Sequence, residues 1–347
     1  MSIKDFDPNA AALPDAGVFC LPHTPEEARV ILVPVPWEVT TSYRTGTAGG
    51  PAAILAASKQ IDLYDVETGK PYVDGIAMLE EDADVRTWNT RGRALASQII
   101  DVAGVIEGNA ALEAALAEVN TLGAQLNDVV KARVSEWLDR GRIVGVVGGD
   151  HSVPFGAIAA VAERHPGVGV LHVDAHADLR DAYEGFTWSH ASIMFNVIEK
   201  LPQVGRLVQV GIRDLCEDEV AVIEGSKGRV VTFFDTELQN GRLAGETWAA
   251  QCDRIVAALP DKVYISFDID GLDPSLCPNT GTPVPGGLLF AQATYLIGHV
   301  VRSGRTIVGF DVNEVAPGPD GDEWDANVGM RLLYKLIGWA LRSQQPR

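Results

Sequence analysis

Side chains that can bind metal ions gather directly after one apolar run of this chain. Residues 168–173 are mostly apolar and predict a buried strand, and Asp174, His176 and Asp178 then follow at every second position. Alternate side chains of a strand point to the same face, so these three groups converge at one strand end. Two carboxylates held so close repel each other, and a bound cation removes that repulsion. We therefore expect a metal site here.

Two further apolar runs, residues 143–147 and 262–267, are also followed by ligand-type side chains. In an open parallel sheet, ligands bind beyond the carboxyl ends of the strands. An unpaired carboxylate leaving the sheet among apolar residues, as Asp268 would, is very costly, and a metal ion resolves that cost. Six ligands are predicted, too many anions for one divalent ion and suited to two: His151, Asp174, His176, Asp178, Asp268 and Asp270. Oxygen and nitrogen donors without sulfur favour Mn(II) and leave Fe, Co, Ni or Zn open.

Strand and helix patterns that could position these ligands alternate along most of the chain. We predict strands at residues 30–35, 143–147, 168–173, 206–210, 229–234, 262–267 and 306–310. Helices are predicted to start near Thr24 and to span residues 52–59, 91–140 (two helices joined near Gly108), 153–164, 191–200, 217–224, 244–259, 290–303 and 325–342. Such alternation indicates an α/β fold with a mainly parallel sheet covered by helices on both faces. We divide the chain into an N-terminal extension, residues 1–28, and a single catalytic domain, residues 29–347.

Composition and charge narrow the class of protein. Of the 347 residues, 46% are hydrophobic and 22% charged, which is typical of a globular protein with a sizeable core. The net charge of −19 argues against nucleic acids and anionic membranes as partners. No apolar run approaches a membrane span, and residues 1–14 show no signal-peptide pattern. Four scattered cysteines predict free thiols in a reducing compartment, so we expect a cytoplasmic protein.

Three motifs carry a resemblance to a known family. Residues 148–152 (Gly-Gly-Asp-His-Ser), 174–178 (Asp-Ala-His-Ala-Asp) and 266–274 (Ser-Phe-Asp-Ile-Asp-Gly-Leu-Asp-Pro) resemble the signatures of the ureohydrolases, which include arginases and agmatinases. The resemblance extends from about residue 30 to the C-terminus and favours the agmatinase-like branch. It implies a three-layer α/β/α fold with about eight parallel strands, a dimanganese centre on the six predicted ligands, with Ni(II) as an alternative metal, and a homo-oligomer, either trimer or hexamer.

The resemblance also implies a reaction. Two divalent cations lower the pKa of a bridging water, and the resulting hydroxide attacks a guanidinium carbon to release urea and an amine. His190 resembles the family histidine that shuttles a proton, and Glu314 resembles the glutamate that holds the guanidinium. Catalytic roles are thus predicted for His190, Glu314 and the ligand Asp178, and Thr282 resembles a threonine of the substrate pocket. Without the resemblance, His190 would be interpreted as a histidine at a helix start and Thr282 as a turn residue.

Another histidine, His172, lies within the strand that precedes the central motif. We expect it to be a core or supporting histidine that faces away from the ligand set, and not a ligand.

The segment 179–189 bears on the substrate. It lacks the Asn- and Ser-rich run with which arginases recognise an amino acid, and offers acidic and aromatic residues instead. Agmatine, hydrolysed to putrescine and urea, is the favoured substrate, with Glu184 or Asp181 meeting its ammonium group and Trp188 in the pocket. Free guanidine would suit a pocket closed by Trp37, Phe186 or Trp188. Guanidinobutyrate or formiminoglutamate would need a cation such as Arg180 or Arg44.

Two other classes of protein share features with this chain. Deacetylases with a related fold act on amides, but the complete ligand set and Glu314 argue against that chemistry. A non-catalytic subunit of a ureohydrolase assembly would not need the ligands or His190.

Overall fold

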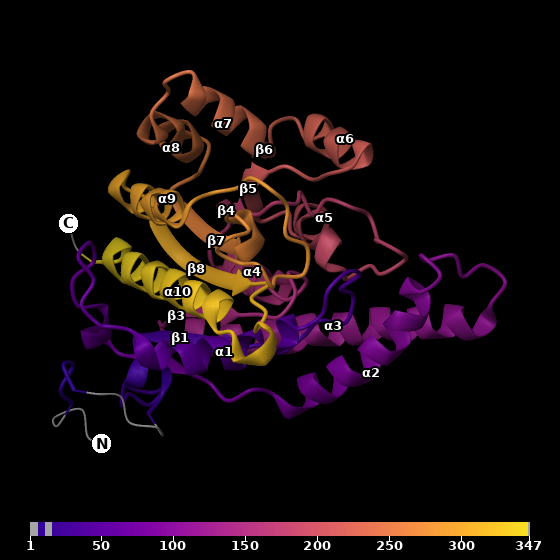
Figure 1. Cartoon of the computed structure of the whole chain (residues 1–347), viewed down its shortest axis with the longest axis horizontal. Coiled ribbons are helices and arrows are strands. Elements are labelled where there is room, and N and C mark those ends of the chain that lie inside the picture. The colour runs from indigo at the N-terminus through magenta and orange to yellow at the C-terminus, as the bar shows by residue number, and fades with distance from the viewer. Residues whose placement is uncertain (1–5, 11–15, 346–347) are drawn as a thin grey trace.

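A parallel sheet runs through the middle of the protein (Figure 1). In this computed structural model the described residues are 6–10 and 16–345, and within them eight strands pair in the order β2-β1-β3-β8-β7-β4-β5-β6, all parallel. The strands are β1 (Val30–Pro34), β2 (Ile76–Met78), β3 (Ile143–Val147), β4 (Val168–Val173), β5 (Val204–Ile212), β6 (Val230–Phe234), β7 (Lys262–Asp268) and β8 (Thr306–Asn313).

Helices cover both faces of the sheet. They are α1 (Gly50–Ala57), α2 (Ala83–Ile100), α3 (Ala110–Asp139), α4 (Phe155–Arg164), α5 (Ile193–Lys200), α6 (Glu217–Gly225), α7 (Asp235–Leu243), α8 (Trp248–Ala257), α9 (Phe290–Arg302) and α10 (Trp324–Ser343). Side chains along β1 alternate between the two faces of the sheet. Val30 and Leu32 pack into the core on the side of α1 and α7–α10. Ile31 and Val33 pack into the core on the side of α2–α5. The predicted three-layer α/β/α fold is confirmed.

Several boundaries differ from the prediction for identifiable reasons. At Thr24 the expected contacts form, with the Glu27 carboxylate accepting from the Thr24 N–H at 3.1 Å, but the chain makes only one turn before β1 begins. The predicted helix 244–259 begins later, as α8, because the chain turns at Gly245 with φ 95° and Thr247 caps the new helix. Helix α7, before that turn, was not predicted. Strand β2 was missed because its three residues are too few to show alternation.

The long helical region 91–140 contains two helices, α2 and α3, as predicted. Helix α2 begins earlier than expected, at Ala83, because the Asp82 carboxylate caps it by accepting from the N–H groups of Asp84 and Val85. The connection between the helices includes Gly104 and Gly108, both with positive φ.

Within the described part of the chain, no helix combines the length and the apolar character needed to cross a membrane.

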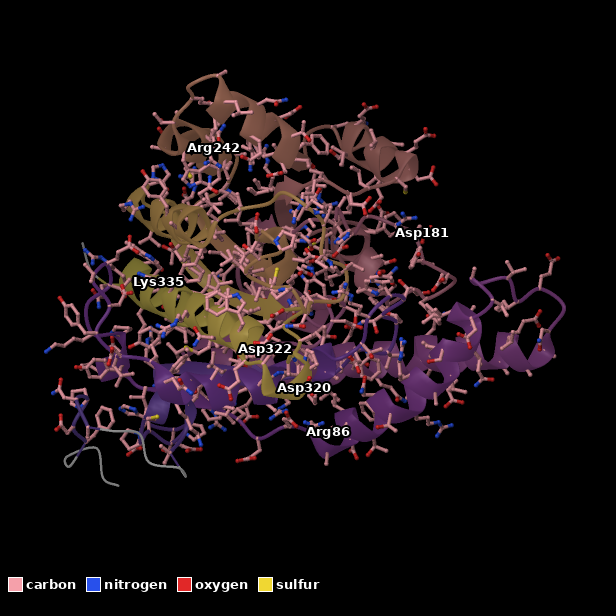
Figure 2. All side chains as sticks on the ribbon, in the orientation of Figure 1. Arg86, Asp181, Arg242, Asp320, Asp322 and Lys335 are labelled. Atoms are coloured by element: carbon pink, nitrogen blue, oxygen red, sulfur yellow. The ribbon has the colours of Figure 1, made fainter. Side chains whose placement is uncertain are left out.

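The segment between α1 and β2 is fastened to α10. Lys335 of α10, labelled in Figure 2, places its Nζ 2.6 Å from Asp65 Oδ2 and 2.8 Å from Glu67 Oε2. The Tyr334 hydroxyl also donates to the Leu63 carbonyl at 2.6 Å. Part of the predicted N-terminal extension belongs to the same core, since Phe19 is buried and packs on Tyr334 with ring centres 4.9 Å apart.

Candidate metal centre and cleft

The predicted site residues meet at one edge of the sheet, beyond the carboxyl ends of its central strands. Strands β3, β8, β7 and β4 are adjacent in that order. His151 follows β3 and Glu314 follows β8, while Asp268 ends β7 and Asp174 follows β4. Parallel strands end at the same edge, which is why segments distant in sequence bring their ligands to one place.

A first group of ligand atoms surrounds His151. Its Nδ1 lies 2.9 Å from Asp174 Oδ2, 3.2 Å from Asp178 Oδ2 and 3.3 Å from Asp268 Oδ2. All four side chains are buried. Asp178 adopts φ 55°, a backbone conformation unusual for a residue other than glycine, which is characteristic of functional sites.

A second group adjoins the first through Asp174. His176 Nδ1 lies 3.4 Å from Asp174 Oδ1 and 3.1 Å from Asp270 Oδ2. Asp174 therefore faces one group with Oδ2 and the other with Oδ1, as a carboxylate shared by two ions would. The structure brings all six predicted ligands together in two adjoining groups.

The charge balance of this cluster fits bound cations. Burial raises the pKa of Asp178 to about 7, and the neighbouring Asp174 adds to the rise. Burial likewise raises the pKa of Asp268 well above its ordinary value, with further contributions from Asp270 and Asp174. These buried carboxylates disfavour their own negative charge, and divalent cations would relieve that penalty. The donor set, four carboxylates and two imidazoles, therefore fits two divalent ions. His172 also lies within reach of the first group.

The prediction that His172 faces away from the ligands is wrong. His172 Nε2 lies 2.8 Å from Asp174 Oδ2, so the ring contacts the shared carboxylate directly. The two residues are separated by two positions, and strand alternation places such residues on the same face. The part of the prediction that makes it a buried, supporting histidine agrees with its position.

Two glycines allow the loop before His151 to pass close to its neighbours. A Cβ on Gly149 would lie 1.9 Å from the Trp37 carbonyl oxygen, and one on Gly148 would lie 1.9 Å from Asn313 Oδ1. Neither glycine has positive φ. Close approach of the chain is therefore what requires glycine here.

Glu314 is buried beside the first ligand group. Its Oε1 accepts from the His151 N–H at 2.9 Å, and its own N–H donates to the Gly149 carbonyl at 2.7 Å. The residue adopts φ 62°, and burial together with the nearby Asp150 raises the pKa of its carboxyl well above the ordinary value. The loop after β3 and the end of β8 are thus locked together at Glu314.

A cleft of about 170 Å³ opens onto the second ligand group. His190 lines it and receives a contact from Thr40 Oγ1, 3.3 Å from the ring Nδ1. Burial lowers the pKa of His190 to about 4, and the nearby His176 and His151 contribute to that shift. The complete lining comprises Ser42, His176, Asp178, Arg180, Tyr183, His190, Ala191, Asp214, Leu215, Glu219 and Thr282.

Among the residues predicted to contact substrate, Thr282 and Arg180 line this cleft, and Glu314 lies outside its lining. The Thr282 hydroxyl lies 3.4 Å from Asp270 Oδ2. The ring of Trp188 packs on Phe155, with ring centres 4.9 Å apart. Glu184 lies against Gly104 in the connection between α2 and α3. Asp181 is exposed (Figure 2) and does not line the cleft either. The structure does not bring these three side chains to the lining.

The cleft contains an acid that the sequence analysis missed. Asp214 is exposed at the rim, and its backbone pairs with that of His176 in an isolated parallel bridge. A signal was available, because Asp214 lies two residues beyond β5, in the same topological position as the ligands after β3 and β4.

Comparison with known proteins agrees with this geometry. Residues 28–338 match the arginase family. The chain is 34% identical over 314 residues to an N(1)-aminopropylagmatine ureohydrolase of Thermus thermophilus, covering 90% of each chain. It is 29% identical to the guanidinobutyrase of Pseudomonas aeruginosa, covering 91% of this chain and 89% of that protein. The agmatine ureohydrolase structure from Thermoplasma volcanium superposes with a TM-score of 0.70 at 24% identity, covering 98% of this chain and 96% of the other.

These matches span nearly the whole of the described fold and include its ligand-bearing strand ends. Proteins of this family carry a binuclear centre of divalent metal ions, and the two adjoining ligand groups are the candidate residues for it here. The chain therefore belongs to the arginase family and is a ureohydrolase that acts on guanidino compounds.

Proposed function

We propose that this ureohydrolase hydrolyses agmatine to putrescine and urea. The observation that carries this choice is Asp214, an exposed carboxylate at the rim of the cleft that leads to the ligand groups. Agmatine carries a guanidinium at one end and an ammonium at the other. With the guanidinium at the metal centre, we assign Asp214 to pair with the ammonium. The net charge of −19 also favours a cationic substrate.

We assign each group of site residues a separate role in the reaction. We assign metal binding to the six ligands, with Mn(II) the ion that suits this donor set and Ni(II) the alternative. When bound, two such ions supply a hydroxide nucleophile near neutral pH. We assign the Glu314 carboxylate, which lies behind the cleft lining and accepts from the His151 N–H, to orienting the guanidinium, and Thr282 to lining the pocket beside Asp270. With its lowered pKa, His190 is neutral near pH 7, so it accepts the proton that the attacking oxygen releases and passes a proton to the departing amine as the bond between that nitrogen and the guanidino carbon breaks.

Guanidinobutyrate is a second candidate because Arg180 also lines the cleft. A guanidinium there could meet a carboxylate tail, and one relative is a guanidinobutyrase. However, Arg180 already lies 3.7 Å from the Glu219 carboxylate and stacks over the Tyr183 ring. Its charge is therefore partly offset, whereas no described residue forms an ion pair with Asp214 in the structure. This difference favours the cationic tail.

Urea release from agmatine, 4-guanidinobutyrate and free guanidine tests the proposal. The wild-type protein should prefer agmatine, and Asp214→Asn should raise the KM for agmatine by about five-fold, the size expected for one exposed charge pair. Free guanidine has no tail, so its turnover should stay unchanged. Asp181→Asn, a loop acid outside the cleft, is the matched control and should resemble the wild type. Faster turnover of guanidine than of agmatine would contradict the proposal.

We also propose a cytoplasmic homo-oligomer, a trimer or hexamer. The four free cysteines support a reducing compartment, and the oligomer rests on the family resemblance. Light scattering during size-exclusion chromatography tests the assembly, and a monomer would contradict it.

A further inference from the structure

A row of polar side chains crosses the sheet directly beneath the ligands. Strand pairing places Thr232 opposite Gln209, Gln209 opposite His172, His172 opposite Ser266, and Ser266 opposite Asp311. The row thus spans β6, β5, β4, β7 and β8. Every member except Thr232 is completely buried. We call these five residues the polar row.

The row lies one layer below the metal centre. His172 precedes the ligand Asp174, just after β4, by two positions, and Ser266 precedes the ligand Asp268, at the end of β7, by two positions. Each therefore lies on the same face as its ligand. Residues next to them in the strands, such as Val173 and Phe267, are apolar and point into the opposite core. Polar groups buried in such surroundings are costly unless they are fully hydrogen-bonded. Each side chain of the polar row therefore needs hydrogen-bond partners inside the protein.

One arm of the row runs from β6 to the shared carboxylate. The Thr232 hydroxyl lies 2.9 Å from Gln209 Oε1, and Gln209 Nε2 lies 3.0 Å from His172 Nδ1. His172 Nε2 then lies 2.8 Å from Asp174 Oδ2. Gln209 makes one more contact, from Nε2 to the Ala177 carbonyl at 2.7 Å.

The directions of these bonds follow from the chemistry of the groups. A carbonyl only accepts, so the Ala177 contact fixes the amide nitrogen of Gln209 as the donor on that side. The same nitrogen must then donate to His172 Nδ1, which leaves the proton of a neutral His172 on Nε2. That proton faces Asp174 Oδ2. Gln209 therefore determines which ring nitrogen of His172 donates to the shared carboxylate.

The other arm holds the first histidine ligand. His151 Nε2 lies 2.9 Å from the Ser266 hydroxyl, which donates to Asp311 Oδ1 at 3.0 Å. With the hydroxyl proton directed at Asp311, Ser266 accepts from the N–H at His151 Nε2. Nδ1 of His151, which faces three carboxylates, is left with its lone pair free for a metal ion.

We propose that the polar row sets the proton positions of the metal centre, and that Gln209 is a positioning residue that makes His172 a hydrogen-bond donor to Asp174. This inference rests on the proposed metal centre and adds residues that touch no ion. Donors to a ligating carboxylate fix its orientation and tune its affinity for metal. Loss of Gln209 should therefore weaken metal binding although the residue lies beyond the ligands.

Metal titration of Gln209→Met tests the role of Gln209. Methionine has a similar length and cannot donate, so His172 loses the partner that fixes its proton. The dissociation constant of at least one Mn(II) site should increase by about 10- to 100-fold, measured by competition with a chelator. Gln251→Met is the matched control, since Gln251 is equally buried but lies in α8 and donates to the Leu238 carbonyl. It should bind Mn(II) as the wild type does.

The melting temperature of the metal-free proteins separates positioning from general damage to the core. Gln209→Met and Gln251→Met should lose similar stability, while only the former loses metal affinity. Mn(II) binding by Gln209→Met within three-fold of the wild type would overturn the inference, as would an equal loss in Gln251→Met. A wild-type protein that binds fewer than two ions would instead contradict the metal centre itself, and this inference with it.

A milder pair of variants serves if Gln209→Met does not fold. Thr232→Val removes only the hydroxyl that donates to Gln209 Oε1, and Thr232→Ser keeps it. The valine variant should weaken Mn(II) binding several-fold, and the serine variant should retain wild-type binding. Equal binding by these two variants would overturn the inference.

Discussion

Nδ1 of His151 lies 2.9 Å from Oδ2 of Asp174, although the strands that precede these residues are not neighbours. Strands β8 and β7 stand between β3 and β4. Three strand spacings amount to about 14 Å, so the chain after β3 and β4 must close this gap. The candidate metal centre therefore lies above β8 and β7, whose ends supply Glu314 and Asp268.

Replacement of His190 should slow the reaction without removing the metal ions. His190→Asn removes the group assigned to proton transfer, and such groups contribute about 10²- to 10⁴-fold to rate. The kcat for urea release should fall by that factor while metal content per chain stays at the wild-type value. His299→Asn, at a partly buried histidine that pairs with Asp253 and does not line the cleft, is the control. Activity of His190→Asn within three-fold of the wild type would exclude the assigned role.

Gly149 should tolerate no side chain. In Gly149→Ala the new methyl group would meet the backbone carbonyl of Trp37 at 1.9 Å, and a backbone atom cannot rotate away. The loop must shift, and His151 with it, so we expect a loss of about 1–3 kcal/mol in unfolding free energy and weaker metal binding. Gly225→Ala, where nothing lies within 4 Å and φ is likewise not positive, controls for the added methyl group. Unaltered metal affinity in Gly149→Ala would show that the loop can relax.

The ion pair between Asp65 and Lys335 should make stability depend on pH. Burial would raise the pKa of Asp65, but hydrogen bonds from Lys335 and Thr68 outweigh it, so that the pKa lies below its ordinary value. A carboxyl with a lowered pKa stabilises the fold above its unfolded pKa and loses that effect as pH falls through the folded value. Metal-free wild type should therefore exceed Asp65→Asn in stability at pH 7, and the difference should shrink below about pH 4.

Denaturant unfolding of both metal-free proteins at pH 7 and at about pH 3.5 measures this change. A difference that is the same at both pH values would mean that the charge of Asp65 contributes nothing. The use of metal-free protein matters because acid also releases ions from the ligands.

Much of the architecture could be predicted because the signals are local. The strands that bear the ligands are apolar runs bounded by polar motifs, and their alternation with helices determines a parallel sheet. Features set by tertiary contact could not be predicted. The three residues of β2 form a strand only because β1 lies beside them, and the reason for Gly149 is the passing chain at Trp37.

For the site, the motifs indicated which residues meet but not what supports them. The six ligands gather because parallel strands end together. By contrast, Asp214 and Gln209 carry no motif of their own, and their roles depend on which strand lies next to which. Trp188 looked suitable for a pocket by its chemistry, but packing against Phe155 turns its ring elsewhere.

Anomalous scattering from crystals of the protein grown with Mn(II) tests the central claim most directly. We predict two peaks within coordination distance of Asp174, one beside Oδ2 with His151 and one beside Oδ1 with His176. A single peak, or peaks that leave Asp174 uncoordinated, would contradict it.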